Sequence, residues 1–384
     1  MNTVGILDQG TSTGTIASSR SITFLTRLPA MPTQIASHSA AIVRLTAAVC
    51  ASLAALTSGA STVVAQRATL TRPTLTGTAL VANQGSASAT IVDVANQRGT
   101  TIDVGTGPHE AVISPDGRWG VVTIYGDRTP GNRLAIIDLA NKSLARHIEL
   151  GDFTRPHGAV FVAGSDSLLA VTSEATQRLL LVDIVAGTVL ADIPTRAGGS
   201  HMVGVTADGT RAYTANIQSG SISEIDLTKR ALVRQLAVAP ATEGIAVRPV
   251  GSEVWVGSND AGTVSVIDTE SWTVATTISG FKLPYRIAIS PDGALAVVCD
   301  PESDTIHIVD IISRKVIGDV SGLGAPRGVI IAPDNRTAFV TVADDPAVVA
   351  VDLVERREVM RVPVGVSPDG VGYSPLAPGA RQLE

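Results

Sequence analysis

The sequence predicts an all-β fold, a seven-bladed β-propeller, from three observations. An apolar run that ends in Asp recurs seven times, about 42–45 residues apart. The runs are short, alternating and β-branched, as in Thr263–Ile267 and Thr305–Val309, which is typical of strands and not of helices. A hairpin marker follows each run by about 24 residues. Four short strands in a period of this length are typical of a propeller blade.

The elements follow one order in every repeat: an inner strand leads into the hairpin, a second strand follows, a third ends at the Asp, and a fourth comes last. The hairpin markers are clearest at Ser114–Gly117, Thr206–Gly209, Ser290–Gly293 and Ala332–Asn335, where Pro fixes φ and Gly or Asn tolerates a positive φ. The third strands end at Asp93, Asp138, Asp183, Asp226, Asp268, Asp310 and Asp352. An Asp can accept hydrogen bonds from the amides of the following turn, so these seven are interpreted as structural.

The two ends of the repeat region complete each other. The first repeat contains a second strand (Ala79–Asn83), a third and a fourth, but its inner strand is missing. Asp369–Pro375 has the form of an inner strand with no successors. Pairing these fragments closes the ring and removes the open sheet edges. The sequence therefore predicts one propeller domain over residues 77–375, with a tail at 376–384.

Residues 1–65 are interpreted as a signal peptide, with a linker at 66–76. Arg44 precedes an apolar stretch without charges, and Val63 and Ala65 place small residues where signal peptidase cleaves. We expect cleavage after Ala65, by the general secretory route, and a periplasmic or secreted product. Met31 is an alternative start. A membrane anchor is the rival interpretation, but the Ala, Ser, Thr and Gly content of the stretch disfavours insertion.

The composition excludes several classes of protein. The chain has 45% hydrophobic and 17% charged residues. This composition is typical of a globular protein and not of a disordered chain or one with a charged tail. A net charge of -6 lacks the basic patch that nucleic acids require. Cys50 and Cys299 are too few for a disulfide framework, and Cys299 is expected to be a small buried apolar residue. Since only 3% of residues are aromatic, the core must consist of Val, Ile, Leu and Ala.

The first residue of each inner strand should lie at the mouth of the central channel. In blade order these residues are His109, His157, His201, Glu243, Tyr285, Arg327 and Asp369. Three imidazoles beside a carboxylate are ligands for a divalent metal ion, so His109, His157 and His201 are candidate metal ligands. On the other side, Arg327 with Tyr285 and Asp369 could bind a carboxylate or oxyanion. The alternative is a turn copied by repeat duplication, with imidazoles that only bind water or loop carbonyls.

The ends of the second strands reach the same face of the ring. Glu174 and Asn216 could there add oxygen ligands for a hard cation or bind substrate hydroxyls, although Asn at a loop end is also a common turn former. The longer loop from Tyr125 to Asn132 is an insertion beside the mouth and could act as a lid or a partner contact.

The strand Ala212–Asn216, with the Val-Ile-Asp and Ser-Pro-Asp-Gly markers around it, resembles the YVTN-repeat (YncE-like) propellers. The resemblance covers nearly all of the mature chain. It implies the propeller fold, while the wider group includes both binding proteins and enzymes. The WD dipeptide and the cofactor signatures of haem- and copper-binding propellers are absent from the sequence.

The favoured function is therefore a binding or scaffold protein that holds a small molecule or a protein at its loop face and channel mouth. The alternative, by resemblance to other propellers, is a metal-dependent lactonase-like hydrolase or lyase, with Glu243 as general base and Arg327 stabilising an oxyanion. Electron transfer is a third possibility. We expect a monomer without nucleic-acid partners and without a stable membrane span in the mature chain. No zincin or nucleotide-binding motif occurs in the sequence.

Overall fold

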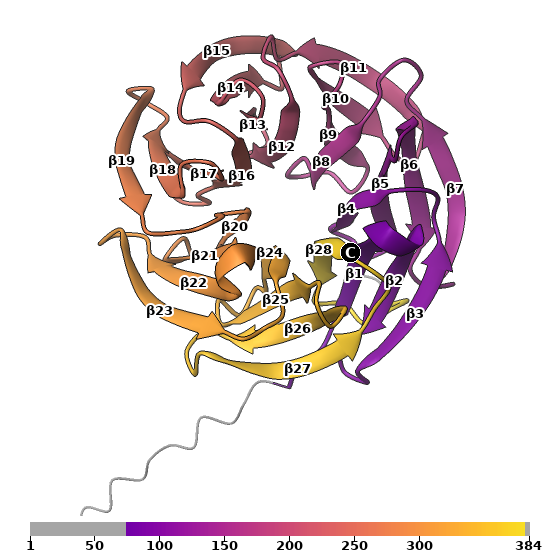
Figure 1. Cartoon of the computed structure of the whole chain (residues 1–384). Coiled ribbons are helices and arrows are strands. Elements are labelled where there is room, and N and C mark those ends of the chain that lie inside the picture. The colour runs from indigo at the N-terminus through magenta and orange to yellow at the C-terminus, as the bar shows by residue number, and fades with distance from the viewer. Residues whose placement is uncertain (1–73, 381–384) are drawn as a thin grey trace, which may run out of the picture. The chain divides into compact units, whose positions relative to one another are not determined.

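Seven four-stranded antiparallel sheets surround a central axis in the computed structural model, which describes residues 74–380 (Figure 1). The predicted seven-bladed propeller is confirmed. The predicted signal peptide, most of the linker and the last four residues of the tail lie outside the described residues. In the described part, no helix is long and apolar enough to cross a membrane.

Blade 1 consists of β28 (Pro368–Ser374), β1 (Thr78–Asn83), β2 (Ser88–Asp93) and β3 (Arg98–Asp103). Blade 2 contains β4 (Pro108–Ile113), β5 (Trp119–Gly126), β6 (Pro130–Asp138) and β7 (Ser143–Glu149), and blade 3 contains β8 (Pro156–Phe161), β9 (Leu168–Ser173), β10 (Arg178–Asp183) and β11 (Thr188–Pro194). Blade 4 contains β12 (Ser200–Val205), β13 (Arg211–Asn216), β14 (Ser221–Asp226) and β15 (Ala231–Ala237).

Blade 5 contains β16 (Thr242–Val247), β17 (Glu253–Ser258), β18 (Thr263–Asp268) and β19 (Thr273–Ser279). Blade 6 contains β20 (Arg286–Ile289), β21 (Leu295–Asp300), β22 (Thr305–Asp310) and β23 (Lys315–Ser321), and blade 7 contains β24 (Pro326–Ile331), β25 (Thr337–Val342), β26 (Ala347–Asp352) and β27 (Arg357–Pro363). Two single-turn 3₁₀ helices, η1 (Gln84–Ser86) and η2 (Pro301–Ser303), follow β1 and β21. The inner strands β4, β8, β12, β16, β20, β24 and β28 face the axis (Figure 1).

The C-terminal strand closes the ring as predicted. Strand β28 pairs antiparallel with β1, in a register that places Thr78 opposite Ser374 and Leu80 opposite Gly372. The ring of Tyr373 stacks on Phe339 of blade 7, with centroids 4.5 Å apart. The first and last described strands therefore share one sheet.

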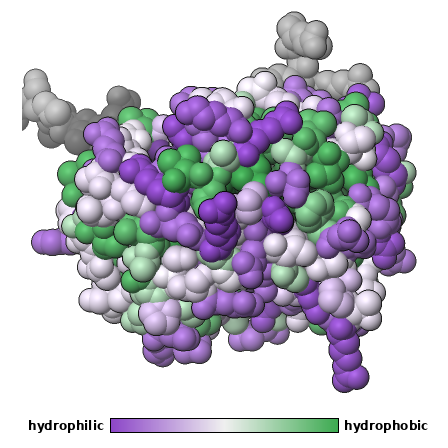
Figure 2. All heavy atoms as spheres, turned by 90° about the horizontal axis from the view of Figure 1, so that it is seen from above, coloured by the Kyte–Doolittle hydropathy of each residue, from purple (hydrophilic) through white to green (hydrophobic). Residues whose placement is uncertain are grey.

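The apolar core lies between neighbouring sheets and is aliphatic, as the composition predicts. In one such cluster Val297 and Ile308 of blade 6 pack with Val340 and Val349 of blade 7. The fourth strands alternate between exposed and half-buried residues, as in β15. On one side of the molecule, hydrophobic and hydrophilic side chains are interspersed (Figure 2).

The turn residues have the structural roles expected of them. The carboxylate of Asp138 accepts hydrogen bonds from the amides of Ala140 and Asn141, both at 3.0 Å. Asp268 accepts from Glu270 and Ser271 in the same way. The thiol of Cys299 is fully buried, and burial raises its pKa, so this cysteine is an unreactive core residue.

A β-bulge at the start of the inner strands positions the channel mouth. The pairing of β4 with β5 shifts by one residue between Pro108 and Ala111, and four further blades shift at the equivalent place. A bulge inserts one extra residue and re-aims the side chains beside it. Two consecutive residues, such as His109 and Glu110, can therefore both reach the channel.

Candidate functional site

The seven residues predicted at the channel mouth come together in the structure. The imidazole of His157 lies between those of His109 and His201, with ring centroids 4.0 and 3.6 Å apart and the rings tilted by 44° and 34°. We call these three rings the histidine stack. Further contacts around the ring link His201 to Glu243, His109 to Asp369, and Tyr285 to Asp369. Arg327 is half-buried, and its charge contributes to the low pKa of Asp369. The repeat alignment therefore identified a real cluster.

Asp369 is the acceptor at one end of the histidine stack. Its Oδ2 lies 2.6 Å from Nδ1 of His109, and its Oδ1 accepts a hydrogen bond from the Tyr285 hydroxyl at 3.4 Å. Burial raises the pKa of Asp369, but His109, Arg286 and Arg327 outweigh burial and hold the pKa well below its usual range. Asp369 is therefore a buried, ionised carboxylate.

His201, at the other end of the stack, lies between two carboxylates. Its Nδ1 is 2.7 Å from Oε2 of Glu174, and its Nε2 is 3.4 Å from Oε1 of Glu243. Burial lowers the pKa of His201, but the contacts with both carboxylates outweigh burial and raise it. The other oxygen of Glu174 accepts a hydrogen bond from the Tyr125 hydroxyl at 3.0 Å. Glu174, predicted from the end of a second strand, thus belongs to the mouth.

His157, in the middle of the stack, has no hydrogen-bond partner for either ring nitrogen among residues 74–380, although it is fully buried. Burial, together with the charges of His109 and His201, lowers its pKa well below the ordinary value, so the ring is neutral. An unsatisfied buried polar group costs about 1–3 kcal/mol. A fully buried imidazole with two free nitrogens therefore requires an explanation.

A network of ion pairs joins blades 2, 5 and 6 next to the mouth residues. The guanidinium of Arg286 in blade 6 donates to Oε1 of Glu110 in blade 2, at 2.8 Å from Nη2 and 3.2 Å from Nε. Its Nη1 donates to Oε1 of Glu243 at 2.6 Å, and the group lies over the ring of Tyr285 at 4.3 Å. All three charged residues are less than 10% exposed. We call Glu110, Arg286 and Glu243 the channel triad.

Sequence reasoning missed Glu110 and Arg286. Each directly follows a predicted mouth residue, at the position where four other blades carry glycine: Gly158, Gly244, Gly328 and Gly370. These glycines allow the close approach of the next inner strand, because a Cβ at Gly328 would lie 2.2 Å from the carbonyl oxygen of Asp369. A charged residue at a position that is glycine in four other blades was the sequence signal that could have identified Glu110 and Arg286.

Both carboxylate oxygens of Glu243 are held in place by neighbouring side chains. Its second carboxylate oxygen accepts a hydrogen bond from Asn259, and its first is held by Arg286. Burial raises the pKa of Glu243, but His201 and Arg286 outweigh it and the pKa is lowered.

Asn216 lies apart from the mouth residues. It is fully buried inside blade 4, where its amide nitrogen donates to Ser221 and Ser223 at 3.3 and 3.0 Å, and its amide oxygen accepts from Thr214 at 3.0 Å. These bonds satisfy the side chain within its own sheet. Tyr125, where the longer loop begins, lies beside the mouth, since its ring centroid is 5.1 Å from that of His109 and 5.5 Å from that of His157.

Two overlapping groups at the mouth could hold a metal ion. One contains His109, Glu110 and His157, and the other contains His157, Glu174 and His201. Within each group the ligand atoms lie within 4.8 Å of one another.

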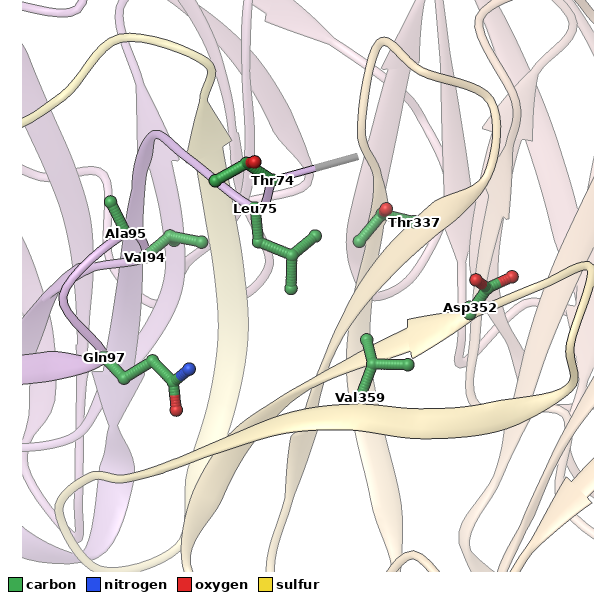
Figure 3. A pocket seen from close by; sticks show the side chains of 8 residues that line it. All are labelled: Thr74, Leu75, Val94, Ala95, Gln97, Thr337, Asp352 and Val359. Carbon is green, nitrogen blue, oxygen red and sulfur yellow. The ribbon is translucent and has the colours of Figure 1, made fainter. Parts of the chain in front are cut away.

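A groove of about 230 Å³ lies elsewhere, between blades 1 and 7 (Figure 3). Leu75 and Val359 project into it, and Asp352 is its one acidic lining residue. That carboxylate is already paired with Arg336 at 2.7 Å. The groove therefore lacks a cluster of polar side chains like the one at the channel mouth.

No protein-family model and no curated protein matches this sequence. Among solved structures, a chain of the hydrazine synthase of Kuenenia stuttgartiensis is similar, with a TM-score of 0.62 and 17% sequence identity. The match covers 76% of this chain and 93% of that chain. At this identity the likeness concerns the fold alone. The chain is a seven-bladed β-propeller.

Proposed function

We propose that this protein is a binding propeller, similar to the YncE-like group, that holds a small charged ligand at its channel mouth. The observation that carries the proposal is the fully buried His157, whose two ring nitrogens have no partner in the described structure. The channel triad links blades 2, 5 and 6 through ion pairs beside this histidine. The mouth thus gathers buried polar side chains from several blades, which favours recognition of a small charged ligand.

Binding is favoured over hydrolysis by the state of Glu243, which the enzymatic alternative requires as general base. Burial raises the pKa of Glu243, but His201 and Arg286 outweigh burial and lower it, which makes Glu243 a weaker general base. Arg327 is half-buried at the mouth, and no hydrogen bond or ion pair ties it to another residue in the described range. It is available for an acidic group of a ligand.

A thermal-shift screen of the full-length protein against divalent cations and small carboxylates tests this function. We expect at least one compound of these two classes to stabilise the wild type, by about 2.7 kcal/mol at 100 times its Kd. His157→Ala should lose this shift. The matched control is His307→Ala, because His307 is on β22 and contacts Asp319 at 2.8 Å, away from the mouth. No shift by any compound, or equal shifts in both variants, would contradict the proposal.

A further inference from the structure

The His157–Glu174–His201 group offers three ligand atoms that a metal ion could share. His157 contributes an imidazole whose two nitrogens have no partner in the described structure, so a lone pair can bind a metal ion. Nδ1 of His201 and Oε2 of Glu174 face each other at 2.7 Å. In a tetrahedral zinc site, ligand atoms about 2.0–2.1 Å from the ion lie about 3.3 Å apart. Binding of an ion would therefore move Nδ1 of His201 and Oε2 of Glu174 apart from their present distance.

The remaining polar atoms of these ligands already have outer partners. A metal-binding histidine usually donates its second N–H to a carboxylate, which fixes the ring. Nε2 of His201 faces Glu243, which Arg286 and Asn259 hold in place. The oxygen of Glu174 that would not bind the ion accepts a hydrogen bond from Tyr125. The group thus has the supporting contacts of a metal site.

The other group, His109–Glu110–His157, is less suited to a cation. Nδ1 of His109 is already 2.6 Å from Asp369. Glu110 binds Arg286 through two hydrogen bonds, so an ion bound there would lie beside a permanent positive charge. The observations therefore favour the His201 side of the stack.

We propose that His157, His201 and Glu174 bind one divalent ion of the zinc class, such as Zn²⁺ or Co²⁺, with one coordination position left open for an exogenous ligand. This inference rests on the proposed function and names the ligand of that mouth. Two imidazoles and one carboxylate suit ions of this class, whereas Ca²⁺ and Mg²⁺ prefer oxygen ligands alone.

The test is a titration of chelator-treated full-length protein with Zn²⁺ by calorimetry and with Co²⁺ by visible absorption. We expect one ion per chain and the strong visible bands of tetrahedral Co²⁺. His157→Ala and His201→Ala should each weaken Zn²⁺ binding by at least about 100-fold. Loss of a residue that only supports a ligand already weakens metal binding by about 10- to 100-fold, and loss of a ligand itself should cost more. Glu174→Gln preserves shape but removes the charge, and should weaken binding at least about tenfold. His307→Ala, the control, should bind Zn²⁺ as the wild type does.

Failure of Zn²⁺ to bind the wild type would overturn the metal site. So would unchanged binding in Glu174→Gln with a native circular dichroism spectrum, or a larger loss in His109→Ala than in His201→Ala. If Zn²⁺ does not bind but a carboxylate still stabilises the wild type and not His157→Ala, the metal inference fails and the proposed function stands. If neither class of ligand acts, both fail.

Discussion

Replacing Arg286 with methionine should destabilise the propeller by about 3–5 kcal/mol, the cost of removing one partner of a buried ion pair. Arg286 is 4% exposed and is the counter-ion of both Glu110 and Glu243. Methionine keeps an unbranched apolar chain but has no charge, so the two carboxylates would stay buried without a cation. Urea unfolding followed by circular dichroism measures the change.

Two companion variants show whether the channel triad is the cause. Arg286→Met combined with Glu110→Gln and Glu243→Gln removes all three charges, and should recover most of the lost stability. Arg327→Met removes a neighbouring, half-buried arginine without such partners, and should cost less than about 1 kcal/mol. Equal losses in Arg286→Met and Arg327→Met would contradict the role given to the triad.

Deleting residues 368–384 should abolish cooperative folding. The deletion removes β28, the inner strand of blade 1, and leaves the fully buried Leu80 and Val81 of β1 at an open edge. It also removes Asp369 from the mouth and Tyr373 from its stack on Phe339. We expect a loss comparable with the whole stability of a typical domain, about 5–15 kcal/mol. Thermal unfolding and size-exclusion chromatography would detect unfolded or aggregated protein.

The control for this deletion removes only residues 377–384. It retains β28 and the hydrogen bond from Thr78 to the carbonyl of Leu376 at 2.8 Å. This shorter deletion should unfold cooperatively near the wild-type temperature. If the long deletion behaved like the short one, the ring would not depend on the C-terminal strand.

Most of the fold could be predicted from the sequence because every blade repeats the same order of strands at nearly the same spacing. Residues at the same phase, such as His157 and His201, become neighbours when successive sheets pack around one axis. The missing inner strand before Ala79 and the surplus one at Asp369 therefore sufficed to predict closure. The same reasoning placed the three histidines in one stack, confirmed by their ring contacts.

The rest of the site depends on strand irregularities and on contacts across the ring, which the spacing of the repeats does not reveal. The bulge in β4 determines that Glu110, and not only His109, reaches the channel. Its partner Arg286 lies 176 residues away, across the ring, so adjacency of blades does not predict the contact. Asn216 was expected at the mouth because it ends a second strand. Its side chain instead makes its hydrogen bonds within its own sheet, and the repeat pattern does not distinguish these two orientations.

X-ray absorption at the zinc edge of the Zn²⁺-loaded, full-length protein tests the central claim most directly. We predict four nitrogen and oxygen ligands at about 2.0–2.1 Å, two of them with the outer-shell scattering of imidazole, and loss of one imidazole in His201→Ala. A shell of six oxygens without imidazole scattering, or an identical spectrum in His201→Ala, would contradict the account.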